Sequence, residues 1–183
     1  MSMSNLPLII LDRDGVINYD SSEYIKNPDE WTAIPGSLEA IAQLNRAGYR
    51  VVIVTNQSGI ARGYYDIDTL DQIHEKLTQE LASVGGYIED IFFCPHHPND
   101  GCYCRKPQTG LFQQIEQKYA VDLTNIFYIG DSLTDMQVAM KTGCKPLLVL
   151  TGNGEKTLAE NPDLAFIDHF PNLSAAVEFI LKK

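Results

Sequence analysis

The chain has 183 residues, 44% hydrophobic and 21% charged, which is the composition of an ordinary globular protein with a sizeable core. Its formal net charge of -10 argues against a nucleic-acid backbone as the main partner, because such binding needs clustered Lys and Arg. The N-terminal apolar run falls far short of the ~20 residues that span a bilayer, which predicts a cytoplasmic protein without a membrane partner.

Apolar runs alternate with segments of helical periodicity along the chain, a pattern typical of a parallel sheet. Strands are predicted at Leu6–Leu11, Arg50–Thr55, Asp90–Phe93, Asn125–Ile129, Pro146–Leu150 and Leu164–Ile167. Helices are predicted within segments 35–48, 66–86, 108–120, 132–143 and 172–183. We therefore predict a single α/β domain over residues 1–183, with three layers: a Rossmann-like parallel sheet and helices on both faces.

Polar loops follow four of the predicted strands. In parallel α/β sheets, ligands bind outside the carboxyl ends of the strands, so these loops should meet at one edge. Their sequences are "DRDGVIN", "TNQSGIARG", the cysteine-rich loop 94–104, and "GDSLTD". This edge is the predicted site.

Acidic residues concentrate in two of these loops. Asp12 and Asp14 follow the first predicted strand, and Asp131 follows the fourth. Carboxylates placed together repel one another, so such a cluster usually holds a cation or shares a proton, and hard oxygen ligands suit Mg²⁺. Asp135, in the first turn of its predicted helix, could equally cap that helix.

The cysteine-rich loop offers soft metal ligands. Cys94, His96, Cys102 and Cys104 form a Cys₃His set that fits a closed structural Zn²⁺ site, with reduced thiols without metal as the alternative. His97 is the competing histidine; Cys94-x-His96 is preferred because it mirrors the Cys102-x-Cys104 spacing. We predict a structural clip that takes no part in the reaction.

"LDRDGVIN", "VTNQSG", Lys106 in "CRKP" and "IGDSLTD" occur in this order over nearly the whole chain. Together they resemble the four motifs of the haloacid dehalogenase superfamily of phosphatases. The resemblance implies that Asp12 attacks phosphorus and forms an aspartyl-phosphate, and that Asp14 is the general acid and base. It implies that Thr55 and Lys106 contact the phosphoryl group, and that Mg²⁺ is held by Asp12, the backbone carbonyl of Asp14, and Asp131. The acid role of Asp14 predicts a raised pKa.

Many members of this superfamily carry a cap domain in one of two places. Here the segment 18–34 has room for a loop only, and the segment between the second and third motifs holds one long helix, one strand and the cysteine loop. The resemblance therefore implies a capless enzyme with an open site.

"DRDGVIN", "TNQSGIARGYY", "CPHHP" and "CYCRKP" resemble a narrower family, the heptose bisphosphate phosphatases. This implies an enzyme that removes the 7-phosphate of a heptose 1,7-bisphosphate, a small phosphorylated sugar, on the route to the nucleotide-activated heptose of lipopolysaccharide. We separately expect the protein to be a monomer. The implied substrate contacts are Asp20, Ser21, Ser22, Glu23, Asn56, Gln57, Ser58, Arg62, Arg105 and Ser132.

Three other functions stay open. Histidinol-phosphate phosphatase is a near relative, and a polynucleotide 3′-phosphatase is disfavoured by the acidic composition. A zinc-stabilised binding module that has lost catalysis is disfavoured because all four motifs are complete. We further interpret "GNGEKT" (152–157) as a turn and helix start, His74 as a solvated surface residue, and Cys144 as a small buried hydrophobe.

Overall fold

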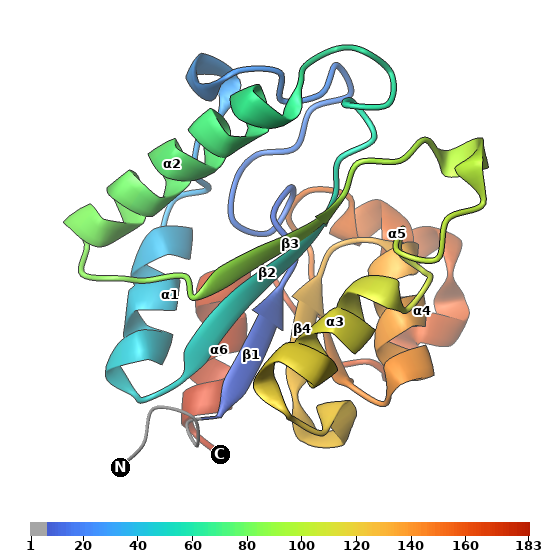
Figure 1. The fold of residues 1–183 in the computed structure, drawn as a ribbon. Coiled ribbons are helices and arrows are strands. Elements are labelled where there is room, and N and C mark those ends of the chain that lie inside the picture. The colour runs from blue at the N-terminus through green and yellow to red at the C-terminus, as the bar shows by residue number, and fades with distance from the viewer. Residues whose placement is uncertain (1–6) are drawn as a thin grey trace.

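The computed structural model describes residues 7–183 and contains, within them, one six-stranded parallel sheet of order β3-β2-β1-β4-β5-β6 (Figure 1). The strands are β1 (Leu8–Leu11), β2 (Arg50–Asn56), β3 (Asp90–Cys94), β4 (Phe127–Gly130), β5 (Lys145–Val149) and β6 (His169–Phe170). The helices are α1 (Ser37–Arg46), α2 (Ile67–Ser83), α3 (Gly110–Tyr119), α4 (Leu133–Thr142), α5 (Gly154–Glu160) and α6 (Leu173–Leu181).

Alternate residues of the strands point into two separate hydrophobic clusters. Ile9 and Leu11 of β1 pack with residues of α1, α2 and α6 on one face of the sheet. Leu8 and Ile10 pack with residues of α3 and α4 on the other face, and Figure 1 shows these helices on opposite sides. The predicted three-layer α/β fold is confirmed, because β-strands with both faces buried need helices on both sides.

Most predicted strands are confirmed with shifts at their ends. β2 and β3 each extend one residue further, and β5 begins one residue earlier than predicted. In the first predicted strand, Leu6 lies outside the described residues, and β1 begins at Leu8. The fourth starts later, at Phe127, because Leu123–Asn125 forms a 3₁₀ turn capped by Asp122.

The last predicted strand is wrong. Residues Leu164–Ile167 lie in and just after a 3₁₀ helix, Pro162–Phe166, and the closing strand is His169–Phe170. Leu164 and Ile167 are both buried in the same small cluster. Apolar residues three positions apart fall on one side of a 3₁₀ turn. A short apolar pattern of this kind is therefore compatible with a 3₁₀ turn as well as with a strand.

The sequence of connections across the sheet changes direction at β1: the chain first adds strands on one side of it and then on the other. β1 pairs with β2 on one side and with β4 on the other, and both neighbours run parallel to it. The loops that follow β1 and β4 therefore diverge above a crevice at their carboxyl ends, the position where ligands bind in such sheets. In addition, no helix within residues 7–183 is both long and apolar enough to cross a membrane.

Candidate active site

The predicted nucleophile and the predicted lysine are in contact above β1. Oδ1 of Asp12 lies 3.0 Å from Nζ of Lys106 and accepts the backbone N–H of Arg13 at 2.8 Å. Asp12 is 7% exposed and Lys106 is 3% exposed. Burial, followed by the carboxylate of Asp135, raises the pKa of Asp12 well above its ordinary value, although Lys106 opposes this. The ionised form of Asp12 therefore needs more positive charge than the protein alone supplies.

Asp135 holds the lysine in place. Its Oδ1 accepts from Nζ of Lys106 at 2.8 Å and from the hydroxyl of Tyr128 at 2.6 Å. Its Oδ2 accepts the backbone N–H groups of Asp131 and Ser132, the latter as part of a capping box at the start of α4. Burial would raise the pKa of Asp135, but Lys106 and these donors lower it. Asp135 thus both caps its helix and pairs with the lysine.

Asp131 sits in a cradle made by two glycines. A Cβ atom on Gly15 or Gly152 would come within 2.1 or 2.3 Å of Oδ2 of Asp131, so no larger residue fits at either position without displacing the carboxylate. The same oxygen accepts the backbone N–H of Asn153 at 2.8 Å and its side-chain Nδ2 at 3.3 Å. Burial and then the carboxylate of Asp135 raise the pKa of Asp131 to about 7.

These carboxylates fit a divalent cation. Oxygens of Asp12, Asp131 and Asp135 lie within 4.8 Å of one another. Both oxygens of Asp135 already accept hydrogen bonds, whereas Oδ2 of Asp12 and Oδ1 of Asp131 accept none from residues 7–183. Two free carboxylate oxygens, on groups whose pKa values are raised by burial and mutual repulsion, are the donor set that Mg²⁺ prefers.

Asp14 is held by four side-chain N–H groups. Nε and Nη2 of Arg13 donate to its two oxygens at 2.9 and 3.2 Å. Asn18 donates to Oδ1 at 2.9 Å and Gln57 donates to Oδ2 at 3.0 Å. Burial would raise the pKa of Asp14, but the guanidinium of Arg13 and these donors outweigh it and lower the pKa. The predicted raised pKa is wrong, because the sequence pattern did not show that Arg13 turns toward Asp14.

The loop after β2 ties the catalytic loops together. Thr55 is buried, and its hydroxyl accepts from Nε2 of Gln57 at 2.9 Å. Oε1 of Gln57 accepts the hydroxyl of Tyr65 at 2.5 Å. Asn56 exchanges two hydrogen bonds with the backbone of Lys106, at 3.0 and 3.2 Å. Amide side chains thus fix both the threonine and the lysine.

A pocket of about 250 Å³ opens above these groups. It is lined by Asp12, Asp14, Asp20, Thr55, Asn56, Arg105, Lys106, Asp131, Ser132, Thr134 and Asn153. Every predicted catalytic side chain borders it, as do four of the predicted substrate contacts: Asp20, Asn56, Arg105 and Ser132. Nη1 of Arg105 is buried without a hydrogen-bond partner in the part of the chain that the structure describes.

The other predicted substrate contacts lie outside the lining of this pocket. Gln57 and Ser58 are buried, and Ser21, Ser22 and Glu23 lie further along the first loop. Arg62 places its guanidinium 5.7 Å from the ring centre of Tyr24. Their contact with substrate stays a prediction.

Three site residues were missed by the sequence analysis. Arg13 is fully buried, and Thr134 and Asn153 line the pocket. Asn153 belongs to the "GNGEKT" segment, which forms the predicted turn and starts α5, but the same segment also contacts Asp131. Arg13 could have been found from the sequence, because it stands between Asp12 and Asp14.

His74 is not the solvated surface residue that was predicted. It is 8% exposed, and its Nε2 atom lies 3.0 Å from Nη1 of Arg13. Burial and then the charge of Arg13 lower the pKa of His74 to about 3. The polar residues around it in sequence suggested exposure, but α2 turns this one position toward the catalytic loop. Cys144 is buried, as predicted.

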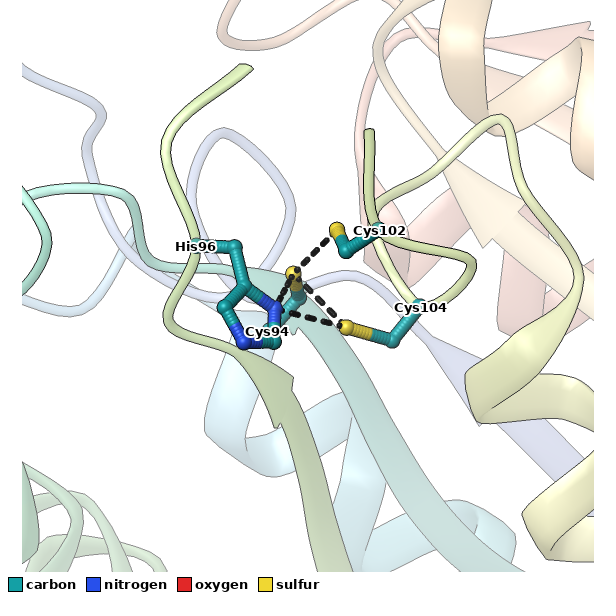
Figure 2. A group of neighbouring side chains, drawn as sticks. All are labelled: Cys94, His96, Cys102 and Cys104. Carbon is teal, nitrogen blue, oxygen red and sulfur yellow. Dashed lines mark hydrogen bonds between the residues drawn. The ribbon is translucent and has the colours of Figure 1, made fainter. Parts of the chain in front are cut away.

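The four predicted soft ligands converge (Figure 2). Sγ of Cys94 lies 3.7 Å from Sγ of Cys102, 3.0 Å from Sγ of Cys104 and 3.5 Å from Nδ1 of His96. Metal–ligand bonds of about 2.3 Å to sulfur and 2.0 Å to nitrogen place tetrahedral ligands about 3.5 to 3.8 Å apart. Burial raises the pKa of the Cys94 thiol to about 12, so a cluster of thiolates here needs a cation.

The neighbouring His97 has a different role. Its side chain accepts the backbone N–H of Asn99 at 3.1 Å, and its own backbone N–H is accepted by Asp100 at 2.8 Å. These bonds form a capping box at the 3₁₀ turn Pro98–Asp100, which shapes the tip of the cysteine-rich loop. His96, rather than His97, belongs to the metal-type cluster.

Comparisons with known proteins place this geometry in a family. Residues 7–167 match the family described as polynucleotide kinase 3 phosphatase. The chain is 56% identical over 155 residues to the D-glycero-beta-D-manno-heptose-1,7-bisphosphate 7-phosphatase of Bordetella bronchiseptica, covering 85% of this chain and 87% of that protein. It is 49% identical over 176 residues to the enzyme of the same name from Pseudomonas aeruginosa, covering 96% and 98%.

Solved structures give the same result. The crystal structure of D,D-heptose 1,7-bisphosphate phosphatase from B. bronchiseptica, complexed with magnesium and phosphate, superposes with a TM-score of 0.94 at 51% identity, covering 97% of this chain and 99% of that one. The homologue from Burkholderia thailandensis superposes with a TM-score of 0.75 at 41% identity, covering 97% and 99%.

The parallel sheet, with carboxylates and a lysine at its central crevice, defines a phosphatase of the haloacid dehalogenase class, as predicted. The relatives at 56% and 49% identity identify the narrower family. The chain belongs to the polynucleotide kinase 3 phosphatase family and, within it, to the D-glycero-D-manno-heptose-1,7-bisphosphate 7-phosphatases.

Proposed function

We propose that this protein is a Mg²⁺-dependent phosphoric monoester hydrolase that removes the 7-phosphate of D-glycero-β-D-manno-heptose 1,7-bisphosphate, in the synthesis of nucleotide-activated heptose. The observation that carries the proposal is the TM-score of 0.94, at 51% identity, with such a phosphatase bound to magnesium and phosphate. The β anomer is favoured because the relatives from Bordetella and Pseudomonas carry it in their names.

Asp12 is the nucleophile of this proposal. Asp12 borders the pocket, and its Oδ2 accepts no hydrogen bond from residues 7–183, while Oδ1 is fixed by Lys106 and by the backbone of Arg13. Attack of a carboxylate oxygen on phosphorus forms an aspartyl-phosphate and expels the sugar alkoxide. Lys106, anchored by Asp135 and Tyr128, faces the charge that develops on the phosphoryl group.

Asp12 and Asp131 would hold Mg²⁺, with the backbone carbonyl of Asp14 as a further ligand. When bound, the ion offsets the repulsion between carboxylates and phosphate and orients the phosphoryl group. Asn153 donates two hydrogen bonds to Oδ2 of Asp131, which leaves Oδ1 available for the cation. Thr55 lines the same pocket, where its hydroxyl can donate to a phosphoryl oxygen.

Asp14 serves as acid and then base from its present position beside the nucleophile. The lowered pKa describes the side chain before substrate binds. A phosphate dianion entering the pocket adds negative charge next to Asp14 and raises its pKa toward the range of a useful acid. Once the alkoxide has taken the proton, the ionised carboxylate is the base that activates water against the aspartyl-phosphate.

Arg105 is the residue best placed to hold the sugar or its second phosphate. It borders the pocket next to Lys106, and its Nη1 atom is buried without a partner among residues 7–183. A guanidinium in such a position suits a phosphate or hydroxyl group of a ligand. Asp20 and Ser132 line the pocket and would contact sugar hydroxyls.

The Cys₃His cluster would bind one structural Zn²⁺. Its four ligand atoms all lie within 4.8 Å of one another, and a closed set leaves no position for a reacting water. Arg105 and Lys106 directly follow Cys104 in the chain, so the cluster is joined directly to the residues that enter the active site. The clip positions Arg105 and Lys106 without taking part in the reaction.

Phosphate release with Mg²⁺ tests the proposal. The panel holds both anomers of heptose 1,7-bisphosphate, histidinol phosphate, fructose 1,6-bisphosphate and a 3′-phosphorylated oligonucleotide. We expect the highest kcat/KM for the β heptose bisphosphate, with loss of the 7-phosphate seen by ³¹P NMR. A preference for histidinol phosphate or the oligonucleotide would contradict the proposed substrate, and Asp12→Asn controls for contaminating phosphatase. Gel filtration of the same sample tests the proposed monomer.

A further inference from the structure

His74 lies behind the active site and contacts no reacting group. It is on α2, in the segment between the second and third motifs, and its Nε2 atom lies 3.0 Å from Nη1 of Arg13. Arg13 is fully buried and donates through Nε and Nη2 to Asp14. Two successive contacts thus join α2 to the proposed acid and base.

The direction of the His74 contact is fixed by chemistry. Arginine has only N–H donors and does not lose its proton in proteins, so Nε2 of His74 must accept and its ring must be neutral, with the proton on Nδ1. Burial and the charge of Arg13 hold the pKa of His74 near 3, in agreement with this. The guanidinium is therefore held on both sides, by an imidazole acceptor and by a carboxylate.

α2 is also hydrogen-bonded to the loop that follows the first motif. Nζ of Lys76 donates to the carbonyl oxygens of Pro28 and Trp31, both at 2.8 Å. These hydrogen bonds join α2 to the first loop. His74 is its contact with the catalytic end of that loop.

We propose that His74 is a positioning residue, which orients the guanidinium of Arg13 so that Arg13 holds the carboxylate of Asp14 beside the nucleophile. This inference rests on the acid role of Asp14 in the proposed function. Without the acceptor at position 74, Arg13 is free to turn, and Asp14 loses two of its four side-chain N–H contacts, one on each oxygen. The contribution of a general acid, typically about 10²- to 10⁴-fold, is then partly lost.

Two substrates separate positioning from folding. A sugar phosphate expels an alkoxide that needs a proton, whereas p-nitrophenyl phosphate expels a phenolate that does not. The ratio kcat/KM covers only the steps up to departure of this first product, so it excludes the later hydrolysis of the aspartyl-phosphate. Loss of a well-placed acid lowers kcat/KM for the sugar phosphate much more than for the aryl phosphate.

The variants are His74→Leu, which removes the acceptor, and His74→Gln, whose amide oxygen can replace Nε2. Leu77→Ala, a buried change on the same helix, controls for lost packing. We expect His74→Leu to lower kcat/KM for heptose bisphosphate about 10-fold and that for p-nitrophenyl phosphate less than about 3-fold. We expect His74→Gln to recover most of the difference, and Leu77→Ala to leave the ratio between the two substrates unchanged.

Equal losses on both substrates for His74→Leu would overturn the inference, and so would failure of His74→Gln to restore the ratio. His74→Asn, whose shorter amide does not reach Arg13, replaces His74→Leu should that variant not fold. Asp14→Asn separates the two proposals. If Asp14→Asn lowers kcat/KM equally for the sugar phosphate and for p-nitrophenyl phosphate, the acid role of Asp14 itself fails. If Asp14→Asn lowers kcat/KM more for the sugar phosphate than for the aryl phosphate and His74→Leu does not, only the positioning role of His74 fails.

Discussion

Nζ of Lys106 lies 3.0 Å from Oδ1 of Asp12, and both side chains are almost fully buried. The same ammonium lies 2.8 Å from Oδ1 of Asp135, so one cation faces two carboxylates. Burial would lower the pKa of Lys106, but these two carboxylates outweigh it and hold the pKa above its ordinary value. The lysine stays charged, yet it does not compensate the carboxylate of Asp12, whose pKa remains raised.

Asp12→Asn should abolish phosphate release and stabilise the metal-free protein. Because burial and Asp135 make the ionised form of Asp12 unfavourable in the folded state, a neutral amide of the same shape removes that cost. An increase of about 1 kcal/mol in the free energy of unfolding corresponds to a rise in Tm of about 2–4 °C for a chain of this size. Thermal unfolding in EDTA measures it. A lower Tm than wild type would show that the contact with Lys106 outweighs the repulsion.

Asn153→Ala should weaken Mg²⁺ binding about 10-fold, since residues that orient a metal ligand typically contribute factors of about 10 to 100. The substitution removes Nδ2 from Oδ2 of Asp131 and from Asp20, while the backbone N–H remains. Calorimetric titration with Mg²⁺ gives the affinity without depending on turnover. Lys156→Ala, an exposed change on the same helix, is the control. Equal affinities of Asn153→Ala and wild type would show that the backbone contact suffices.

The position of Lys106 at the site was implied by the resemblance to the haloacid dehalogenase superfamily. Local sequence patterns predicted the strand–helix order, the edge of the sheet that holds the site, and the clustering of Asp12 and Asp131. These features follow from periodicity and from the rule that parallel strands end together. The hydrogen-bond partners could not be predicted in this way. The contact between Arg13 and His74 joins residues 61 positions apart, and whether a guanidinium pairs with the preceding or the following aspartate depends on side-chain rotamers.

The error at Asp14 has the same origin. Neighbouring carboxylates and burial alone predict a raised pKa, and burial is indeed the largest influence. Arg13, Asn18 and Gln57 together supply enough donors to reverse the sign. A sum of opposing contributions of this kind depends on distances of about 3 Å, which spacing along a chain does not specify.

Cys102→Ser should remove zinc and lower activity, whereas Cys144→Ser should do neither. Cys102 belongs to the four-residue cluster, while Cys144 is buried elsewhere, among the residues that pack with α3 and α4. Metal analysis should find about one Zn²⁺ per chain in wild type and in Cys144→Ser, by the four-ligand argument. We expect kcat of Cys102→Ser to fall about 10-fold, because a misplaced Lys106 stabilises the transition state less well. Wild-type protein without zinc would contradict the clip.

The pH dependence of stability should reveal the buried His74. Its pKa is about 3 in the folded state and about 6.5 in the unfolded chain. Above pH 6.5 the imidazole is neutral in both states, so its full contribution is present. As the pH falls below 6.5 the unfolded chain takes up the proton first, and stability is lost progressively toward pH 3.

At pH 5 this loss amounts to about 2 kcal/mol, at 1.36 kcal/mol for each unit between the pH and the unfolded pKa. Urea unfolding of wild type and His74→Gln in EDTA isolates the effect, since all other titrating groups are shared. The free energy of unfolding of wild type should fall by about 2 kcal/mol more than that of the variant between pH 7.5 and 5. Between pH 7.5 and 9 the difference between the two proteins should stay constant. Parallel curves from pH 7.5 to 5 would mean that His74 takes up a proton without unfolding, and that its contact with the Arg13 guanidinium is weaker than the 3.0 Å distance implies.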